Sequence, residues 1–145
     1  TQDLSLDEVL AKYYDAIGGL DAWQKVDTMV MEGVIHTQDQ KIPTAAEYMR
    51  PDKCRVEYTI REEVVIQAFD GASAWEKNPH STSPGPVKLD KGRTDYLGDK
   101  CDIEGPLVGY KNKNLKVTLD GRKAGGDRNT YVIKVTYPSG NLQYY

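Results

Sequence analysis

The segment from Lys53 to Trp75 carries the clearest hydrophobic pattern of the chain. From Cys54 to Ile60, apolar and polar side chains alternate, and this period of two predicts a strand with one buried and one exposed face. After the polar pair Glu62-Glu63, the run from Val64 to Phe69 is almost entirely apolar, and Asp70-Gly71 supplies a turn into a third strand. The pattern therefore predicts three adjacent antiparallel strands. The second of them is expected in mid-sheet, packed on both faces.

The N-terminal region has helical spacing instead. Ser5 and Glu8 match a capping box, and the apolar side chains between Val9 and Ile17 fall on one stripe of a helix. Gly18-Gly19 ends this helix. Leu20–Val26 is long enough for a second, short helix.

The other predicted elements are strands and two covering helices. Lys88–Tyr110 predicts two short helices, broken by Gly98 and by Gly105-Pro106. The strand Lys41–Arg50 is expected to be weak and to be interrupted by Pro43. The last two connections between strands are expected to be turns at Gly125-Gly126-Asp127 and at Pro138-Ser139-Gly140. The remaining predicted strands are Asp27–Gln38, Lys41–Arg50, Leu115–Leu119, Thr130–Tyr137 and Asn141–Tyr145.

The last strand ends in mid-pattern. Leu142–Tyr145 resembles the beginning of a strand, so its backbone groups are expected at an open sheet edge. Two explanations remain open: the chain is a fragment, or a partner supplies the missing strands. Either way, we expect self-association through this edge.

Composition narrows the functional classes. The 145 residues fit one domain, and the net charge of −3 has both signs interspersed, so no basic face indicates nucleic-acid binding. No apolar run approaches the ~20 residues that a membrane span needs.

Catalytic signatures are missing from the sequence. His36 and His80 lack the spacing of a helical metal pair, and neither Cys54 nor Cys101 has a histidine nearby in sequence. No serine lies in a G-x-S-x-G elbow. The sequence therefore predicts a protein that is not an enzyme, with no cofactor and no bound metal.

Several motifs resemble a known family. They are L-S-L-D-E-V-L-A-K-Y-Y-D-A-I-G-G-L-D-A-W, the Arg50-Pro51 step with C-R-V-E, V-I-Q-A-F-D-G-A-S-A-W-E-K-N-P, and I-E-G-P-L-V-G-Y-K. Together they resemble outer-membrane lipoprotein-sorting proteins of the LolA/LolB-like superfamily, in a poorly characterised branch. The chain departs from the pattern of that branch at Cys54, Phe69 and Gly109, where Phe, Tyr and Asp respectively are commoner.

The resemblance implies an α+β fold. We expect a strongly curved antiparallel sheet, a half-barrel, with helices covering its concave face. Residues 1–145 would form a single LolA-like domain that is incomplete at the C-terminus. The implied location is the periplasm, reached by secretion across the inner membrane.

The resemblance also implies a function: a periplasmic carrier or sensor that holds lipid or lipoprotein acyl chains in an apolar cavity. An alternative is a protein-interaction module that uses sheet-edge pairing without a small ligand, and a third hypothesis is a hydrolase acting on a lipid. At each single position, ordinary core packing also explains an apolar side chain. The expected cavity lining is Met29, Met31, Ile35, Val56, Tyr58, Ile60, Ile66, Trp75, Leu107 and Ile133.

The predicted positions of the two cysteines bring them within reach of each other. Cys54 would point inward from the central hairpin, and Cys101 would open the second covering helix. In an oxidising periplasm a disulfide between them would tie the covering segment to the sheet. Two free buried thiols are the other alternative, and the sequence leaves both open.

Overall fold

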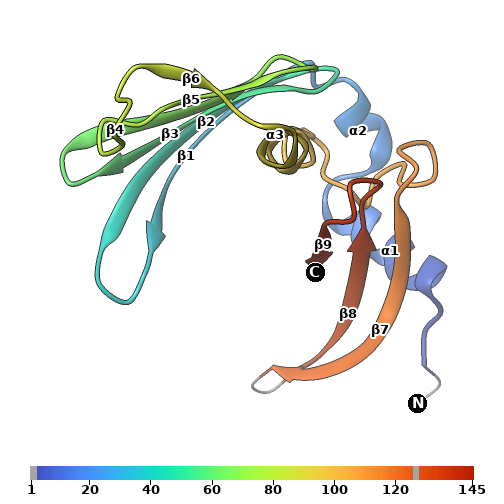
Figure 1. The fold of residues 1–145 in the computed structure, drawn as a ribbon. Helices are drawn as coiled ribbons and strands as arrows, with labels where there is room; N and C mark the ends of the chain where they lie inside the picture. Colours follow the sequence, from blue (N-terminus) through green and yellow to red (C-terminus); the bar gives the residue numbers. More distant parts are fainter. Residues whose placement is uncertain (1–2, 126–127) are drawn as a thin grey trace. The chain divides into compact units, whose positions relative to one another are not determined.

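The computed structural model describes residues 3–125 and 128–145, and it is an α+β structure whose sheets are antiparallel (Figure 1). This confirms the predicted class. The contacts within the chain divide it into two compact units. The central unit is Val26–Ile103, and the terminal unit joins Thr1–Lys25 to Glu104–Tyr145. The single LolA-like domain expected over residues 1–145 stays a prediction.

The central unit is built on a six-stranded sheet in which each strand pairs with the next strand along the chain. Short hairpins can make every such connection, as is common for antiparallel sheets. The first and last strands have one neighbour each, so the sheet is open at both edges in the described residues. The strands are β1 (Thr28–His36), β2 (Lys41–Met49), β3 (Lys53–Ile60), β4 (Glu63–Phe69), β5 (Ala74–Lys77) and β6 (Pro86–Lys88).

The central hairpin forms as its pattern predicted, with β4 between β3 and β5. Arg61 and Glu62 both have positive φ, which is the backbone of the tight two-residue turns that join antiparallel strands. The prediction that β4 is packed on both faces is wrong for one face. Val65 is buried at 5% exposure, whereas Val64, on the other face, is 39% exposed.

Strand β2 runs through Pro43 without a break. At Pro43 the strand is paired with Val34 of β1, whereas its pairing with β3 begins only at Thr44. Proline lacks a backbone N–H and is tolerated where a strand has a free side. The local edge at Pro43 explains why the strand is not interrupted.

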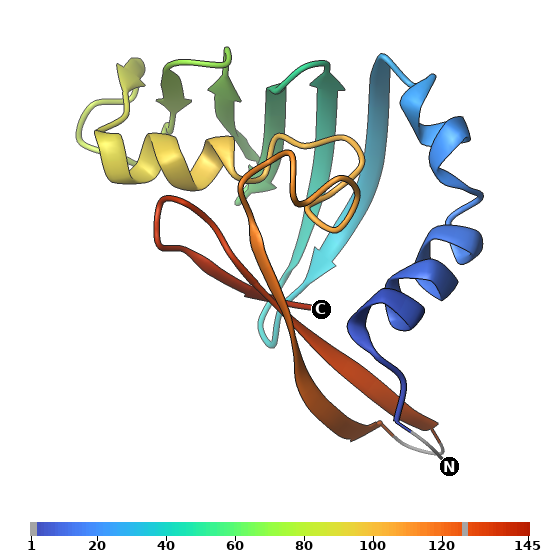
Figure 2. The ribbon, with the colours of Figure 1, turned by 90° about the vertical axis from the view of Figure 1, so that its right-hand side faces the viewer.

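Helix α3 (Lys91–Gly98) lies across β4 and β5 (Figure 2). Its N-cap is Asp90, whose Oδ1 accepts a hydrogen bond from the backbone N–H of Arg93 at 3.0 Å. The helix joins a small core in which Leu89, Leu97 and Cys101 pack with Cys54, Ala74, Tyr48 and Phe69.

The second covering helix does not form. Residues 103–114 are a series of turns, and Cys101 lies three residues after the end of α3 instead of opening a helix. Gly105 and Gly109 have positive φ, a left-handed conformation that ends helices, and Pro106 lacks the N–H that a helix interior requires. The spacing of apolar residues in this segment therefore predicted a helix that its glycines and proline prevent.

The terminal unit contains two helices and a three-stranded sheet. The capping box is present, because the backbone N–H of Ser5 donates to Glu8 Oε2 at 2.8 Å and that of Glu8 donates to Ser5 Oγ at 3.3 Å. The elements are α1 (Leu6–Ala16), α2 (Leu20–Gln24), β7 (Lys116–Gly125), β8 (Arg128–Thr136) and β9 (Leu142–Tyr144).

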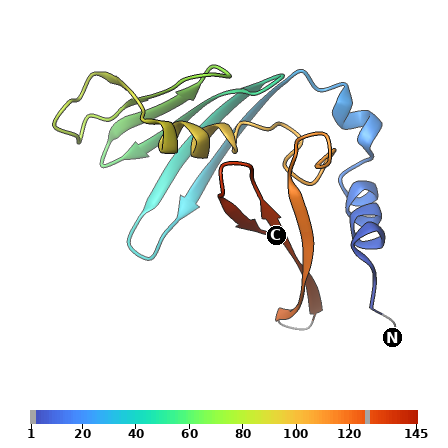
Figure 3. The ribbon, with the colours of Figure 1, turned by 45° about the vertical axis from the view of Figure 1, so that its right-hand side comes forward.

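Strands β7 and β8 form a long hairpin (Figure 3), and β9 pairs with β8. Strand β7 continues beyond its predicted end at Leu119 because the register shifts between Leu119 and Arg122, where Gly121 has positive φ. The predicted turn at Gly125-Gly126-Asp127 lies partly outside the described residues.

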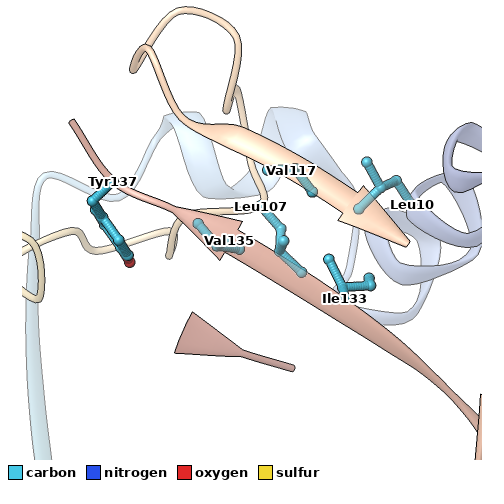
Figure 4. Packing of buried hydrophobic residues seen from close by; sticks show 6 residues of the cluster. All are labelled: Leu10, Leu107, Val117, Ile133, Val135 and Tyr137. Atoms are coloured by element: carbon cyan, nitrogen blue, oxygen red, sulfur yellow. The ribbon is translucent and has the colours of Figure 1, made fainter. Parts of the chain in front are cut away.

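One core holds the terminal unit together (Figure 4). Leu10 of α1 packs with side chains of β7 and β8 and with Leu107 from the turn segment. Tyr14 adds a hydrogen bond from its Oη to the carbonyl of Leu107 at 2.7 Å. The buried members are Leu10, Leu107, Val117, Ile133, Val135 and Tyr137.

Candidate functional site

The pairing register shows which side chains share a face of the six-stranded sheet. Val56 is paired with Ala46, and Ala46 with Met31, so these three side chains lie in one row across β3, β2 and β1. Tyr58, two residues further along β3, lies in the next row with Thr44. We call the face that carries Cys54, Val56 and Tyr58 the pocket face.

A pocket of about 600 Å³ lies on this face. Its volume is within the range of small-molecule sites, which is roughly 300–1,000 Å³. Along β1 it extends from Met31 to Ile35, about 13 Å at ~3.3 Å per residue. The sheet contributes side chains that are mostly apolar or uncharged: Met31, Ile35, Thr44, Ala46, Tyr48, Cys54, Val56, Tyr58 and Gln67.

The hollow exists because small residues occupy its floor. Gly33 has no side chain, and a Cβ atom there would meet nothing within 4 Å. Thr44 and Ala46 on β2 are also small, whereas Met31 and Ile35 on either side of Gly33 are 49% and 44% exposed. A large apolar area therefore remains open to solvent on one side of the sheet.

One end of the pocket is closed by α3 and the residues that follow it. Leu97 is buried against the sheet, while Tyr96 and Lys100 line the pocket from the exposed side of the segment. Lys100 Nζ lies 4.1 Å from the centroid of the Tyr96 ring and donates a hydrogen bond to Tyr96 Oη. This end thus places a cation beside an apolar hollow.

A disulfide between Cys54 and Cys101 fixes that end to the sheet. The two Cα atoms are 5.2 Å apart, and both residues are buried in the core beneath α3. Of the two alternatives that the sequence left open, the structure has the disulfide. Cys54 is also part of the pocket lining, so the bridge and the pocket share a residue.

A polar group borders the pocket at Gln67. Its Nε2 donates to Glu76 Oε2 at 2.7 Å, and an Arg93 guanidinium N–H donates to the same oxygen at 2.8 Å. Burial raises the pKa of Glu76, but the hydrogen bonds from Gln67 and Arg93 and the charge of Arg93 outweigh it, so the pKa of Glu76 is lowered. The carboxylate is therefore charged and occupied by its partners, and it ties β5 to α3.

A second hollow of about 440 Å³ shares Tyr58 and Gln67 with the pocket. It is lined by more polar residues, His80 among them. The imidazole contacts the carbonyl of Ile60 at 3.0 Å through Nε2 and Glu63 at 3.4 Å through Nδ1. Both ring nitrogens have protein partners, so His80 acts here as a link between its loop and the β3–β4 hairpin.

Four of the predicted lining residues meet in the pocket: Met31, Ile35, Val56 and Tyr58. Two others lie beside it in separate hollows. Met29 lines one of about 370 Å³, and Ile60 lines the one that contains His80.

Ile66 and Trp75 were predicted to line the cavity but do not lie on the pocket face. Ile66 is paired with Glu57, and Trp75 with Ala68, which places both side chains on the face opposite Val56 and Tyr58. Because β4 is apolar at nearly every position, its sequence did not show which residues face the pocket. The register assigns Val65 and Gln67 to the pocket face instead.

Leu107 and Ile133 were also predicted to line the cavity and do not. Both are buried in the core of the terminal unit, at 3% and 5% exposure, and they pack there with Leu10 and Val135. Their burial is the ordinary core packing that the sequence left open as an alternative.

The sequence missed the residues that give the pocket its shape and its charge. The missing side chain of Gly33 was not recognised as the floor of a hollow. Tyr96, in α3, and Lys100, two residues after the helix, are spaced at i and i+4. This spacing brings two side chains together at a helix end, and it was the available signal.

Comparison with known proteins and a search for membrane spans or metal clusters assign no function to the pocket. Searches of protein-family models, of curated proteins and of solved structures found no match for this chain. Among the described residues, no helix combines the length and the apolar character needed to cross a membrane. Over the same residues, no three His, Cys, Asp or Glu side chains gather as metal ligands would.

Proposed function

We propose that the pocket face of the central unit binds an acyl chain and that the protein is a periplasmic carrier or sensor of lipid or lipoprotein acyl groups. The observation that carries this proposal is the open apolar hollow over Gly33, flanked by Met31 and Ile35. Soluble proteins rarely leave a contiguous apolar surface uncovered unless something binds there.

The chemistry of the lining suits a hydrocarbon chain. An acyl chain needs no hydrogen-bonding partner, only apolar volume, and burial contributes ~0.8 kcal/mol per CH₂. Met31 has an unbranched, polarisable side chain that adapts to irregular shapes, and Val56 and Ala46 offer no polar atoms. The partly buried side chains of Gln67 and Glu76 already have partners at the border of the pocket.

Two further features support the proposal. Helix α3 packs on the pocket face, as expected if helices cover the concave side of a half-barrel. The disulfide between Cys54 and Cys101 fits an oxidising compartment such as the periplasm. The proposal also includes a half-barrel curvature of the sheet and a location in the periplasm, and its central element is acyl binding.

A second candidate is a protein-interaction module that accepts a strand from a partner. The observation that favours it is β1, a nine-residue edge strand with mostly exposed side chains. An edge of this length offers unpaired backbone groups to another chain.

A binding titration tests the acyl proposal. Wild-type protein is titrated with a fluorescent fatty acid, and the variant Gly33→Leu is compared with it. The leucine side chain would fill the floor of the hollow, and because φ at Gly33 is not positive and the site is open, the sheet tolerates the change. We expect at least a tenfold loss of affinity.

The matched control is Thr59→Leu, which adds a leucine side chain to the opposite face of the sheet, where Thr59 is paired with Val64. It should bind like wild type. The proposal fails if wild type takes up no acyl probe, or if Gly33→Leu and Thr59→Leu bind equally well. Co-purification of a defined protein partner with an acyl-free pocket would favour the strand-addition candidate.

A further inference from the structure

We infer that the pocket selects acyl chains that end in an anionic group and that Lys100 binds the anion. This inference rests on the proposed acyl-binding function and names the class of ligand. The ligand would lie with its chain along Met31, Gly33 and Val56 and its headgroup at the α3 end.

Lys100 is the cationic side chain of the pocket lining. The other charged residue in that lining, Glu32, alternates with Met31 and Gly33 along β1, so its carboxylate lies on the opposite face of the sheet. The Glu76 carboxylate lies on the pocket face at the border of the pocket, but it already accepts hydrogen bonds from Arg93 and Gln67. Lys100 is therefore the charged group that the pocket presents to a ligand. An anionic headgroup matches it and a cationic one does not.

Tyr96 holds the ammonium group in place. The ring lies 4.1 Å from Nζ, and Oη accepts one of the three N–H donors. The remaining donors are available for carboxylate or phosphate oxygens, with which a lysine forms charge-assisted hydrogen bonds. Because the position of Nζ is set before a ligand arrives, less side-chain entropy is lost on binding.

The disulfide restrains the segment that carries Lys100. Cys101 is the residue after Lys100, and its bond to Cys54 fixes the backbone of this segment to β3. Cys54 and Val56 belong to the pocket lining, so a covalent link holds the backbone that carries Lys100 beside the apolar hollow. A surface lysine on a free loop would have no such constraint.

The experiment compares headgroups on one chain. Dodecanoate, dodecyl phosphate and dodecanol displace a fluorescent neutral acyl probe from the full chain at pH 8 and low salt. Wild type should bind both anions about tenfold more tightly than the alcohol. Lys100→Gln should remove this preference while leaving dodecanol affinity within about twofold of wild type.

Two controls make the test specific. Lys77→Gln removes the same charge from the central unit, at a position paired with Ile66 on the opposite face, and should keep the preference. Acetate and inorganic phosphate without a chain should displace no probe at millimolar concentration, which separates an anionic lipid from a free anion. Tyr96→Phe keeps the ring but loses the acceptor for Lys100, and should reduce the preference partly.

The outcomes distinguish the role of Lys100 from acyl binding itself. Equal affinity of wild type for dodecanoate and dodecanol, or an unchanged preference in Lys100→Gln, overturns the role of Lys100 and leaves acyl binding intact. Absence of any binding by wild type overturns both. Displacement of the probe by free phosphate alone would assign the site to a small anion and also contradict the inference.

Discussion

The ring of Phe69 lies directly against the backbone of Gly98. A Cβ atom on Gly98 would be 3.0 Å from Phe69 Cζ and 3.3 Å from both Cε atoms, closer than side chains normally approach. The last residue of α3 is thus in contact with the last residue of β4, and the absence of a side chain allows the helix to reach the sheet.

Gly98→Ala should therefore destabilise the central unit. The new methyl group would push against the Phe69 ring, and overpacking of this kind costs roughly 1–3 kcal/mol. Urea unfolding followed by Trp75 fluorescence in a Trp23→Phe background measures the effect, since the central unit contains Trp75 and the terminal unit contains Trp23.

The control for Gly98→Ala lies in the same helix. At Gly92 a Cβ atom would meet only Asp90 Oδ1, at an ordinary 3.5 Å. Gly92→Ala should raise stability by up to about 1 kcal/mol, because alanine is the better helix former. If both variants are stabilising, the contact with Phe69 does not limit the packing of α3.

Removal of the disulfide should have a larger effect. The bond closes a loop with a sequence separation of 47, which is worth about 4 kcal/mol in the chain-entropy model. We expect Cys54→Ala with Cys101→Ala to lower the unfolding free energy by 2–4 kcal/mol. Thiol quantification under denaturing, non-reducing conditions provides the direct check: two free thiols per wild-type chain would contradict the bridge.

Acid should weaken the tie between α3 and β5. The pKa of Glu76 is lowered in the folded state, so its ion pair with Arg93 contributes stability above the ordinary glutamate pKa of 4.5 and loses it as the pH falls through the lower folded value. The pair is partly exposed, so we expect about 0.5 kcal/mol.

Glu76→Gln provides the comparison for this pH dependence. It should be less stable than wild type at pH 7, and the difference should shrink below pH 4. Unfolding curves at pH 7, 5 and 3.5 test the sign. A difference that grows on acidification would show that the Glu76 carboxylate destabilises the fold.

The terminal unit can be tested separately through Leu107. Its side chain is 3% exposed in the core with Leu10 and Val135. Leu107→Ala should cost about 2–5 kcal/mol, measured by Trp23 fluorescence in a Trp75→Phe background. A cost below 1 kcal/mol would mean that the core around Leu107 readjusts to fill the space.

The sequence predicted most of the local structure because its signals were local. The capping box at Ser5, the alternation from Cys54 to Ile60 and the turn glycines each specify one element. The strand through Pro43 and the missing second helix were predicted incorrectly, since both depend on neighbours: whether a strand has a free side, and whether glycines adopt positive φ.

The candidate site was predictable only in part. Alternation placed Met31, Ile35, Val56 and Tyr58 on one face, and the register confirms that arrangement. The alternation of apolar and polar residues could not show which face carries Ile66, because an uninterrupted apolar run has no period. Leu107 shows a further limit, since an apolar pattern does not state which of two cores a side chain joins.

The division into units also determines an order of events during synthesis. The central unit is one uninterrupted stretch, whereas the terminal unit needs chain from both sides of it. The meander can form hairpin by hairpin as it leaves the ribosome, and Cys101 arrives last to close it. Helix α1, eleven residues long and too short to be stable alone, must wait for β7 and β8. Helix α1 is translated before the central unit but is therefore expected to fold after it.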